Sequence, residues 1–177
     1  VNTAVQNINI NISNKLKNLE FNQQEKIDKI LIDLDGTENK TNLGANATLA
    51  VSLAYAKCTA IANKQPLYKS LGKSYSIPLP LMNIINGGAH ADNGLRIQEF
   101  MIRPDKAKSF TEAVRMCYLV INNLRTLLKQ SGHSINVGDE GGFAPMISDN
   151  ESALKLIVKA IKKSGFKNGE DISICLD

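Results

Sequence analysis

The chain changes its sequence pattern near residue 74, and this change limits the folds open to it more than any other feature. Before it, apolar residues such as Ile27, Ile30 and Leu34 recur every three or four positions, which predicts amphipathic helices. After it, short apolar runs alternate with glycine-rich loops and longer helical segments. The order strand, strand, helix, loop, helix, strand indicates an α/β architecture. We therefore predict two domains, residues 1–73 and 74–177.

The first domain is predicted to be helical. Residues 45–62 are rich in alanine and carry a single charged side chain, Lys57, so this helix is expected to be buried between other elements. Pro66 begins a further short helical turn, and the segment around Gly72 is typical of a linker.

Strands are predicted in the second domain over residues 78–85, 99–102 and 171–177. Two helices lie between them, and each is expected to begin at a capping box, formed by Ser109 with Glu112 and by Ser148 with Glu151. The first of these helices is expected to end at Gly132. Its predicted apolar face consists of Phe110, Ala113, Val114, Cys117, Val120, Ile121, Leu124 and Leu128.

Composition excludes several classes of protein. The net charge of +4 is spread along the chain and only 5% of the residues are aromatic, which does not favour a nucleic-acid site. Cys58, Cys117 and Cys175 are too far apart for a disulfide framework or a zinc site, so we expect buried, reduced thiols in a cytosolic protein. No apolar run approaches the roughly 18 residues of a membrane span. The chain begins at Val1 without a signal peptide, and we expect it to start inside a longer protein.

The run Asp33-Leu34-Asp35-Gly36-Thr37 allows two interpretations. It resembles the nucleophile motif of haloacid-dehalogenase-type phosphatases, in which one aspartate attacks phosphorus and Mg²⁺ neutralises the phosphate. The residues before it have helical rather than strand periodicity, however. The alternative is a helix C-terminus that turns on Gly36, with local hydrogen bonds from the Asp and Thr side chains.

Polar residues gather in two glycine-containing loops of the second domain. The segment from Asn83 to Arg103 holds a Gly-Gly pair, His90, Gln98 and Glu99, and a histidine in such a loop can bind phosphate or move protons. Glu140 lies among glycines, and if Glu99 lay beside it the two carboxylates would share a proton and one pKa would rise, as a general acid requires. The alternatives are a surface loop with an incidental histidine and an ordinary acidic turn.

Asp177 ends the last predicted strand. An acid at the C-terminal end of a parallel strand lies where α/β barrels build active sites, and its oxygens suit Mg²⁺. One carboxylate does not make a metal site, so this position is also compatible with no function.

Together these segments resemble the enolase family, of the bacterial type, over essentially the whole chain. The resemblance is carried by Asp33 to Ala47, by Met82-Asn83-Ile84-Ile85-Asn86-Gly87-Gly88 with His90 to Asn93, by Gln98 to Ile102, and by Val137 to Pro145. It implies an incomplete enolase-type (β/α) barrel, preceded by the helical part of a small α+β N-terminal domain. It favours the helix-terminus interpretation of Asp33 to Thr37.

The resemblance also implies an activity, the reversible dehydration of 2-phosphoglycerate to phosphoenolpyruvate with Mg²⁺. By position, Glu140 would be the proton donor and Glu99 the second carboxylate beside the leaving hydroxyl. Gln98 would contact the substrate, His90 would close over its phosphate end, and Asp177 would be a Mg²⁺ ligand. The base lysine, the other metal carboxylates and an Arg-Ser phosphate clamp are expected downstream.

Other properties follow from the same resemblance. It implies a homodimer or higher homo-oligomer in the full-length protein, association with an RNA-degradation complex, and a cytoplasmic location, with secreted and surface forms in some members. Because an unclosed barrel exposes strand edges, we expect the 177-residue polypeptide by itself to be inactive and prone to aggregate. The alternatives left open are a non-catalytic interaction module or remnant, and a phosphatase that uses Asp33.

Overall fold

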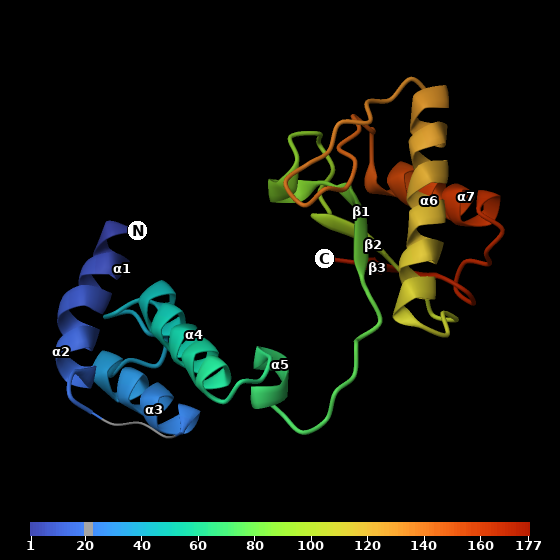
Figure 1. Ribbon diagram of the computed structural model, residues 1–177. Coiled ribbons are helices and arrows are strands. Elements are labelled where there is room, and N and C mark those ends of the chain that lie inside the picture. Colours follow the sequence, from blue (N-terminus) through green and yellow to red (C-terminus); the bar gives the residue numbers. More distant parts are fainter. Residues whose placement is uncertain (20–22) are drawn as a thin grey trace. The chain divides into compact units, whose positions relative to one another are not determined.

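The computed structural model describes residues 1–19 and 23–177, which form two compact units, Val1–Ser76 and Ile77–Asp177 (Figure 1). Each unit is described by itself. The assignment of residues 1–73 and 74–177 to separate domains stays a prediction. No helix in the described part of the chain is long and apolar enough to cross a membrane.

The N-terminal unit consists of helices. Its elements are α1 (Asn2–Gln6), the π-helical turn η1 (Asn7–Ile12), α2 (Ser13–Leu16), α3 (Gln24–Asp35), α4 (Ala45–Ala62) and α5 (Leu67–Ser70). Ile12, Leu31, Leu43 and Ala47 form its small core. Pro66 immediately precedes α5, as predicted.

Helix α4 is less buried than its composition predicted. Ala47, Ala56 and Ala60 are buried, whereas Leu49 is 57% exposed and Ile61 is 75% exposed. The prediction of a helix covered on all sides is therefore wrong within this unit. Among the described residues of this unit, α4 packs against α3, α5, η1 and α1, and the part of its surface that carries Leu49 and Ile61 stays uncovered.

The Asp33 to Thr37 segment is a helix terminus. Gly36 caps α3 in the left-handed conformation, with φ of 70°. The buried Asp35 carboxylate accepts hydrogen bonds from the Leu43 and Thr37 amides and from the Thr37 hydroxyl. Burial alone would raise the pKa of Asp35, but these hydrogen bonds outweigh it and lower the pKa. Asp33 is exposed and pairs with Lys29 at 3.1 Å, so both acids have structural partners.

The C-terminal unit is a three-stranded sheet with two long helices on one face (Figure 1). Its elements are β1 (Met82–Asn86), the 3₁₀ turn η2 (Gly88–His90), β2 (Glu99–Arg103), α6 (Phe110–Gln130), α7 (Asn150–Lys163) and β3 (Ser173–Leu176). The core is built from both strands and helices, with fully buried Ile84, Phe100, Leu124, Phe143 and Ile157 at its centre. This mixed helix and strand unit agrees with the predicted incomplete α/β barrel.

The sheet has the order β1-β2-β3, and both neighbouring pairs are antiparallel. The expectation that Asp177 ends a parallel strand is therefore wrong about the direction of that strand. It follows β3, whose only neighbour in the described sheet is β2, and β2 runs in the opposite direction. Strand β1 also starts later than predicted, at Met82, because Pro78 and Pro80 have no N–H to donate to a sheet.

Strand β1 contains an irregularity. Asn83 pairs with Met101, but Ile85 pairs with Phe100, so the register shifts between Asn83 and Ile85. As a result, the successive residues Ile84 and Ile85 are both fully buried.

One of the two predicted caps is correct. The Ser109 hydroxyl accepts from the Glu112 amide at 3.1 Å, and the Glu112 carboxylate accepts from the amide of Lys108 rather than from that of Ser109. The prediction for α7 is wrong, because Asp149 is its N-cap and accepts from the Ser152 amide at 2.7 Å. A carboxylate accepts more strongly than a serine hydroxyl, which favours Asp149 as the cap. Hydrogen bonds from Ser148 and Ser152 stabilise its charged form and lower its pKa to about 2.

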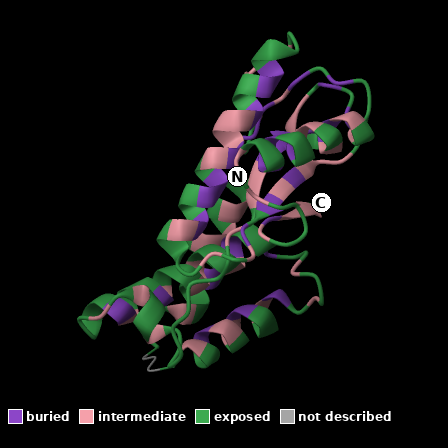
Figure 2. Cartoon of the chain, turned by 90° about the vertical axis from the view of Figure 1, so that its right-hand side faces the viewer, coloured by how far each residue is buried: buried purple, intermediate pink, exposed green. Residues whose placement is uncertain are grey.

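The amphipathic pattern of α6 is visible in Figure 2, where buried and exposed residues alternate along the helix. Its predicted face is buried at Ala113, Cys117, Val120, Leu124 and Leu128, but Phe110 and Val114 are exposed. Both lie in the first two turns of the helix.

Of the three cysteines, only Cys117 is fully buried, and burial raises the pKa of its thiol to about 11. Cys175 is half-buried and Cys58 is exposed, so the prediction of three buried thiols is wrong. Cys58 lies on α4, whose outer side this unit leaves uncovered.

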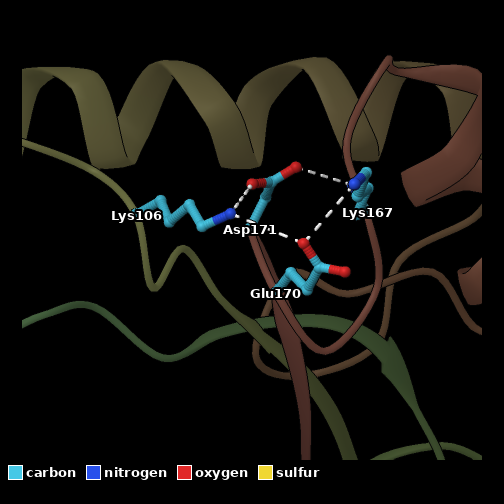
Figure 3. Close-up of polar contacts among 4 residues, drawn as sticks. All are labelled: Lys106, Lys167, Glu170 and Asp171. Carbon is cyan, nitrogen blue, oxygen red and sulfur yellow. Dashed lines mark hydrogen bonds and ion pairs between the residues drawn. The ribbon is translucent and has the colours of Figure 1, made fainter.

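A polar cluster holds the segment before β3 against the loop that follows β2 (Figure 3). Lys106 Nζ lies 3.0 Å from the Asp171 carboxylate and 3.7 Å from that of Glu170. The Lys167 amide donates to Asp171 at 2.8 Å, and the Lys167 ammonium lies 3.6 Å from Glu170. The hydrogen bond from the Lys167 amide, followed by the hydrogen bond and charge of Lys106, keeps the pKa of Asp171 below its usual value.

Candidate acid–base site

Three segments of the C-terminal unit meet at the start of β2. Glu99 is the first residue of β2 and pairs in register with Asn86, the last residue of β1. His90 lies in η2, in the loop between these strands. Glu140 lies in a separate loop, which is joined to β1 where the Phe143 amide donates to the Ile84 carbonyl and the Asn86 amide donates to the Phe143 carbonyl, both at 2.9 Å.

The side chains of His90, Glu99 and Glu140 converge. His90 Nδ1 lies 3.7 Å from a Glu99 carboxylate oxygen and 3.8 Å from a Glu140 carboxylate oxygen. These separations are too long for direct hydrogen bonds but allow charge interaction when the histidine is protonated. The His90 and Glu99 side chains are 21% and 18% exposed, whereas Glu140 is 46% exposed, so Glu140 is the more accessible of the two carboxylates.

The two carboxylates differ in their surroundings. Burial raises the pKa of Glu99, and a hydrogen bond with Glu140 together with the charges of Glu140 and Asp177 raises it further, while His90 opposes this change. The sequence analysis left open whether Glu99 and Glu140 lie together, and the structure brings them together. Glu99 is the member of the pair that holds a proton more tightly than usual.

Asp177 and Gln98 lie beside this cluster. The Asp177 carbonyl accepts hydrogen bonds from the Gln98 amide at 2.9 Å and the Glu99 amide at 3.0 Å, and the Asp177 amide donates to the Glu99 carbonyl at 3.2 Å. Gln98 is half-buried and packs against Gly88, whereas Asp177 is exposed. All five residues predicted for the site therefore lie in one region of this unit, and their roles stay predictions.

The residues offer two arrangements for a cation. The donor atoms of His90, Glu99 and Glu140 all lie within 4.8 Å of one another, but a nitrogen donor and a carboxyl with a raised pKa suit Mg²⁺ poorly. The exposed Asp177 carboxylate is a hard oxygen ligand of the kind that Mg²⁺ prefers. One carboxylate is compatible with Mg²⁺ but does not make a metal site, so the role of Asp177 as a ligand stays a prediction.

The sequence analysis did not identify Asn86 and Asn93 as members of the site. Both are buried, and the Asn93 side chain donates to the Asn86 carbonyl at 2.8 Å, which ties the His90 loop to the end of β1. The sequence does contain one indication of its role: Asn86 stands between an apolar run and a glycine pair, where a polar residue is placed next to the core.

The fold and the site together define a mixed strand and helix domain that brings a histidine and two carboxylates together at one end of its strands. The comparisons specify the class further. Residues 74–177 match the enolase C-terminal TIM barrel domain, and residues 1–71 match the enolase N-terminal domain. The chain therefore belongs to the enolase family.

Individual relatives agree with this assignment. The chain is 64% identical to an enolase of Pelagibacter ubique (strain HTCC1062) over 172 residues, which cover 96% of the chain and 41% of that relative. It is 50% identical to an enolase of Corynebacterium kroppenstedtii over 179 aligned positions, which cover 100% of the chain and 42% of the relative. The chain thus spans about two fifths of the length of these curated relatives.

Proposed function

We propose that this chain is part of a longer enzyme that reversibly dehydrates 2-phosphoglycerate to phosphoenolpyruvate. The observation that carries the proposal is the convergence of Glu99 and Glu140, from separate segments, at a site where Glu99 has a raised pKa. Dehydration of a 2-phospho-3-hydroxy acid needs a group that delivers a proton to a departing hydroxyl, and a pair of carboxyls that share a proton provides one.

In this proposal Glu140 donates the proton. As the bond between C3 and its oxygen breaks, the proton moves from the Glu140 carboxyl to that oxygen and water leaves. The proton that the pair shares is the one transferred, and the less exposed Glu99 orients Glu140. Removal of the proton next to the substrate carboxylate requires a base that the complete protein must supply.

The other site residues would bind the substrate. His90 lies in a glycine-containing loop and could approach the phosphate end, and Gln98 would contact the substrate beside Glu99. Asp177 would hold Mg²⁺, which when bound supplies positive charge that stabilises the negative charge developing on the substrate carboxylate.

The test is Glu140→Gln in the full-length protein. It removes the transferable proton and preserves the shape of the side chain, so we expect kcat to fall about 10²- to 10⁴-fold while substrate still binds. Formation of phosphoenolpyruvate is followed by its ultraviolet absorbance. The matched control is Glu151→Gln on α7, an exposed carboxylate that pairs with Lys155 and should leave kcat unchanged. Normal turnover by Glu140→Gln would show that the acid is elsewhere.

The assembly and location remain proposals that follow from the family resemblance: a homo-oligomer in the cytoplasm, with association to an RNA-degradation complex. Exposed apolar side chains of the N-terminal unit, such as Ile61 and Leu71, support further packing of this surface in the complete protein. We also propose that the 177-residue polypeptide alone does not form phosphoenolpyruvate. Sedimentation of the full-length protein tests the oligomeric state. An assay for phosphoenolpyruvate tests the inactivity of the short polypeptide.

A further inference from the structure

Asn86 lies at the junction of all the segments that carry the acid–base site. It is fully buried at the end of β1 and is paired in register with Glu99. Its carbonyl accepts from Asn93 in the His90 loop, and its amide donates to Phe143 at the end of the Glu140 loop. The backbone of Asn86 is thus linked to each segment that contributes a side chain to the site.

The side chain of Asn86 fills the space between two glycines that flank Glu140. A Cβ atom added to Gly138 would lie 2.5 Å from Asn86 Nδ2, and one added to Gly142 would overlap Asn86 Oδ1. The Glu140 loop closes on itself where the Gly138 amide donates to the Gly142 carbonyl at 2.8 Å. The carboxamide therefore contacts both ends of the closed loop that presents Glu140.

These contacts are not hydrogen bonds. Within residues 1–19 and 23–177, neither Nδ2 nor Oδ1 of Asn86 has a hydrogen-bond partner, although both atoms are buried. A buried amide without a hydrogen-bond partner is unfavourable. The structure therefore supports a packing contribution of the Asn86 side chain, between the two glycines.

We infer that Asn86 is a positioning residue whose side-chain volume sets the distance of the Glu140 loop from β1, and so the placement of Glu140 against Glu99. The inference rests on the proposed function for its catalytic consequence. It makes a specific claim, that shape rather than hydrogen bonding is what this position requires.

The first experiment compares Asn86→Ala with Asn86→Leu in the full-length protein. Alanine leaves a void into which the loop can relax, so kcat should fall at least about tenfold with little change in KM, since small displacements of a catalytic group are costly. Leucine branches at Cγ as asparagine does and has no polar atoms, but its methyl groups are larger; it fills the space that alanine leaves, so kcat should stay well above that of Asn86→Ala. A leucine variant as slow as the alanine variant, or an alanine variant with full kcat, would overturn the inference.

Asn83→Ala is the matched control. Asn83 lies on the same strand, and its side-chain amide is likewise buried without a partner among the described residues, but none of its atoms is among the three nearest to a Cβ added at Gly138 or Gly142. This variant should lower the melting temperature and leave kcat unchanged. A loss of kcat equal to that of Asn86→Ala would show a general effect of disturbing β1.

The second experiment does not depend on activity. Gly142→Ala should lower the melting temperature strongly, because its new methyl group overlaps Asn86 Oδ1. In the Asn86→Ala background that oxygen is gone, and the remaining contacts to Ile84 and Ile85 backbone atoms, at 3.1 Å, need only small adjustments. The decrease in melting temperature caused by Gly142→Ala should therefore be at most half as large in that background as in the unsubstituted protein.

The same measurement on Gly138→Ala provides a contrast, since its Cβ would also lie 2.7 Å from the His90 carbonyl and cannot be relieved in this way. Additive losses for Gly142→Ala and Asn86→Ala would refute the spacer role even if activity behaved as expected. Absence of turnover in the unsubstituted protein would instead refute the proposed function, while the melting data would still decide the role of Asn86.

Discussion

Phe143 offers the clearest quantitative test of how the Glu140 loop is held. Its side chain is 1% exposed and belongs to the central core, and its backbone is hydrogen-bonded to β1. Truncation of such a phenylalanine to alanine costs about 3–5 kcal/mol, from lost burial and from the cavity that remains. Arg125, whose guanidinium lies 5.6 Å from the ring centroid, adds about 0.5–1 kcal/mol because it is exposed.

We therefore expect Phe143→Ala to lower the free energy of unfolding by about 3–6 kcal/mol. Urea denaturation of the full-length protein, followed by circular dichroism and analysed with a common slope, measures this change as a shift of the midpoint. The control is Phe110→Ala, which removes a ring that is 47% exposed and should cost less than about 1 kcal/mol. Equal midpoints for the two variants would refute the claim that Phe143 anchors the loop.

Further predictions concern a cap, a glycine and an ionic cluster. Ser109→Ala should destabilise α6 by about 1 kcal/mol, measured by urea denaturation, and Ser109→Asp should restore it. Gly87→Ala should lower the melting temperature sharply, because its Cβ would lie 2.7 Å from that of Leu95, whereas Gly72→Ala, with open space around it, should not. Asp171 has a lowered pKa when folded, so its stabilising effect is present above the unfolded value near 3.9 and is lost as the pH falls through the folded value. The difference in stability between the unsubstituted protein and Asp171→Asn should therefore shrink below about pH 4, and a difference that grew in acid would contradict this sign.

Local signals predicted those features that depend on neighbouring residues. The periodicity of α6, its Ser109 cap and the turn at Gly36 were all correct, because each is decided within a few residues of the chain. The cap of α7 was misassigned by one residue, because the Asp149 carboxylate is the stronger acceptor: it caps the helix at the Ser152 amide, and the Ser148 hydroxyl donates to it.

Features that depend on distant segments were harder to predict. The alanine-rich sequence of α4 does not say which of its sides meets α3, so the exposure of Leu49 and Ile61 was not foreseen. The direction of β3 relative to β2 depends on the path of the chain through α6 and α7. The site residues were identified through family resemblance, whereas the proximity of Glu99 to Glu140 required the pairing of Phe143 with β1, which no local pattern encodes.

The shift of register in β1 has a consequence for how this segment can vary. Side chains alternate between the two faces of a sheet. A one-residue insertion or deletion between Asn83 and Asn86 would therefore move the buried side chains of the strand to the opposite face. Asn86 would then turn away from Gly138 and Gly142, and Glu99 would face a different neighbour. The bulge thus makes the spacing of β1, as much as its residue types, a requirement for assembling the site.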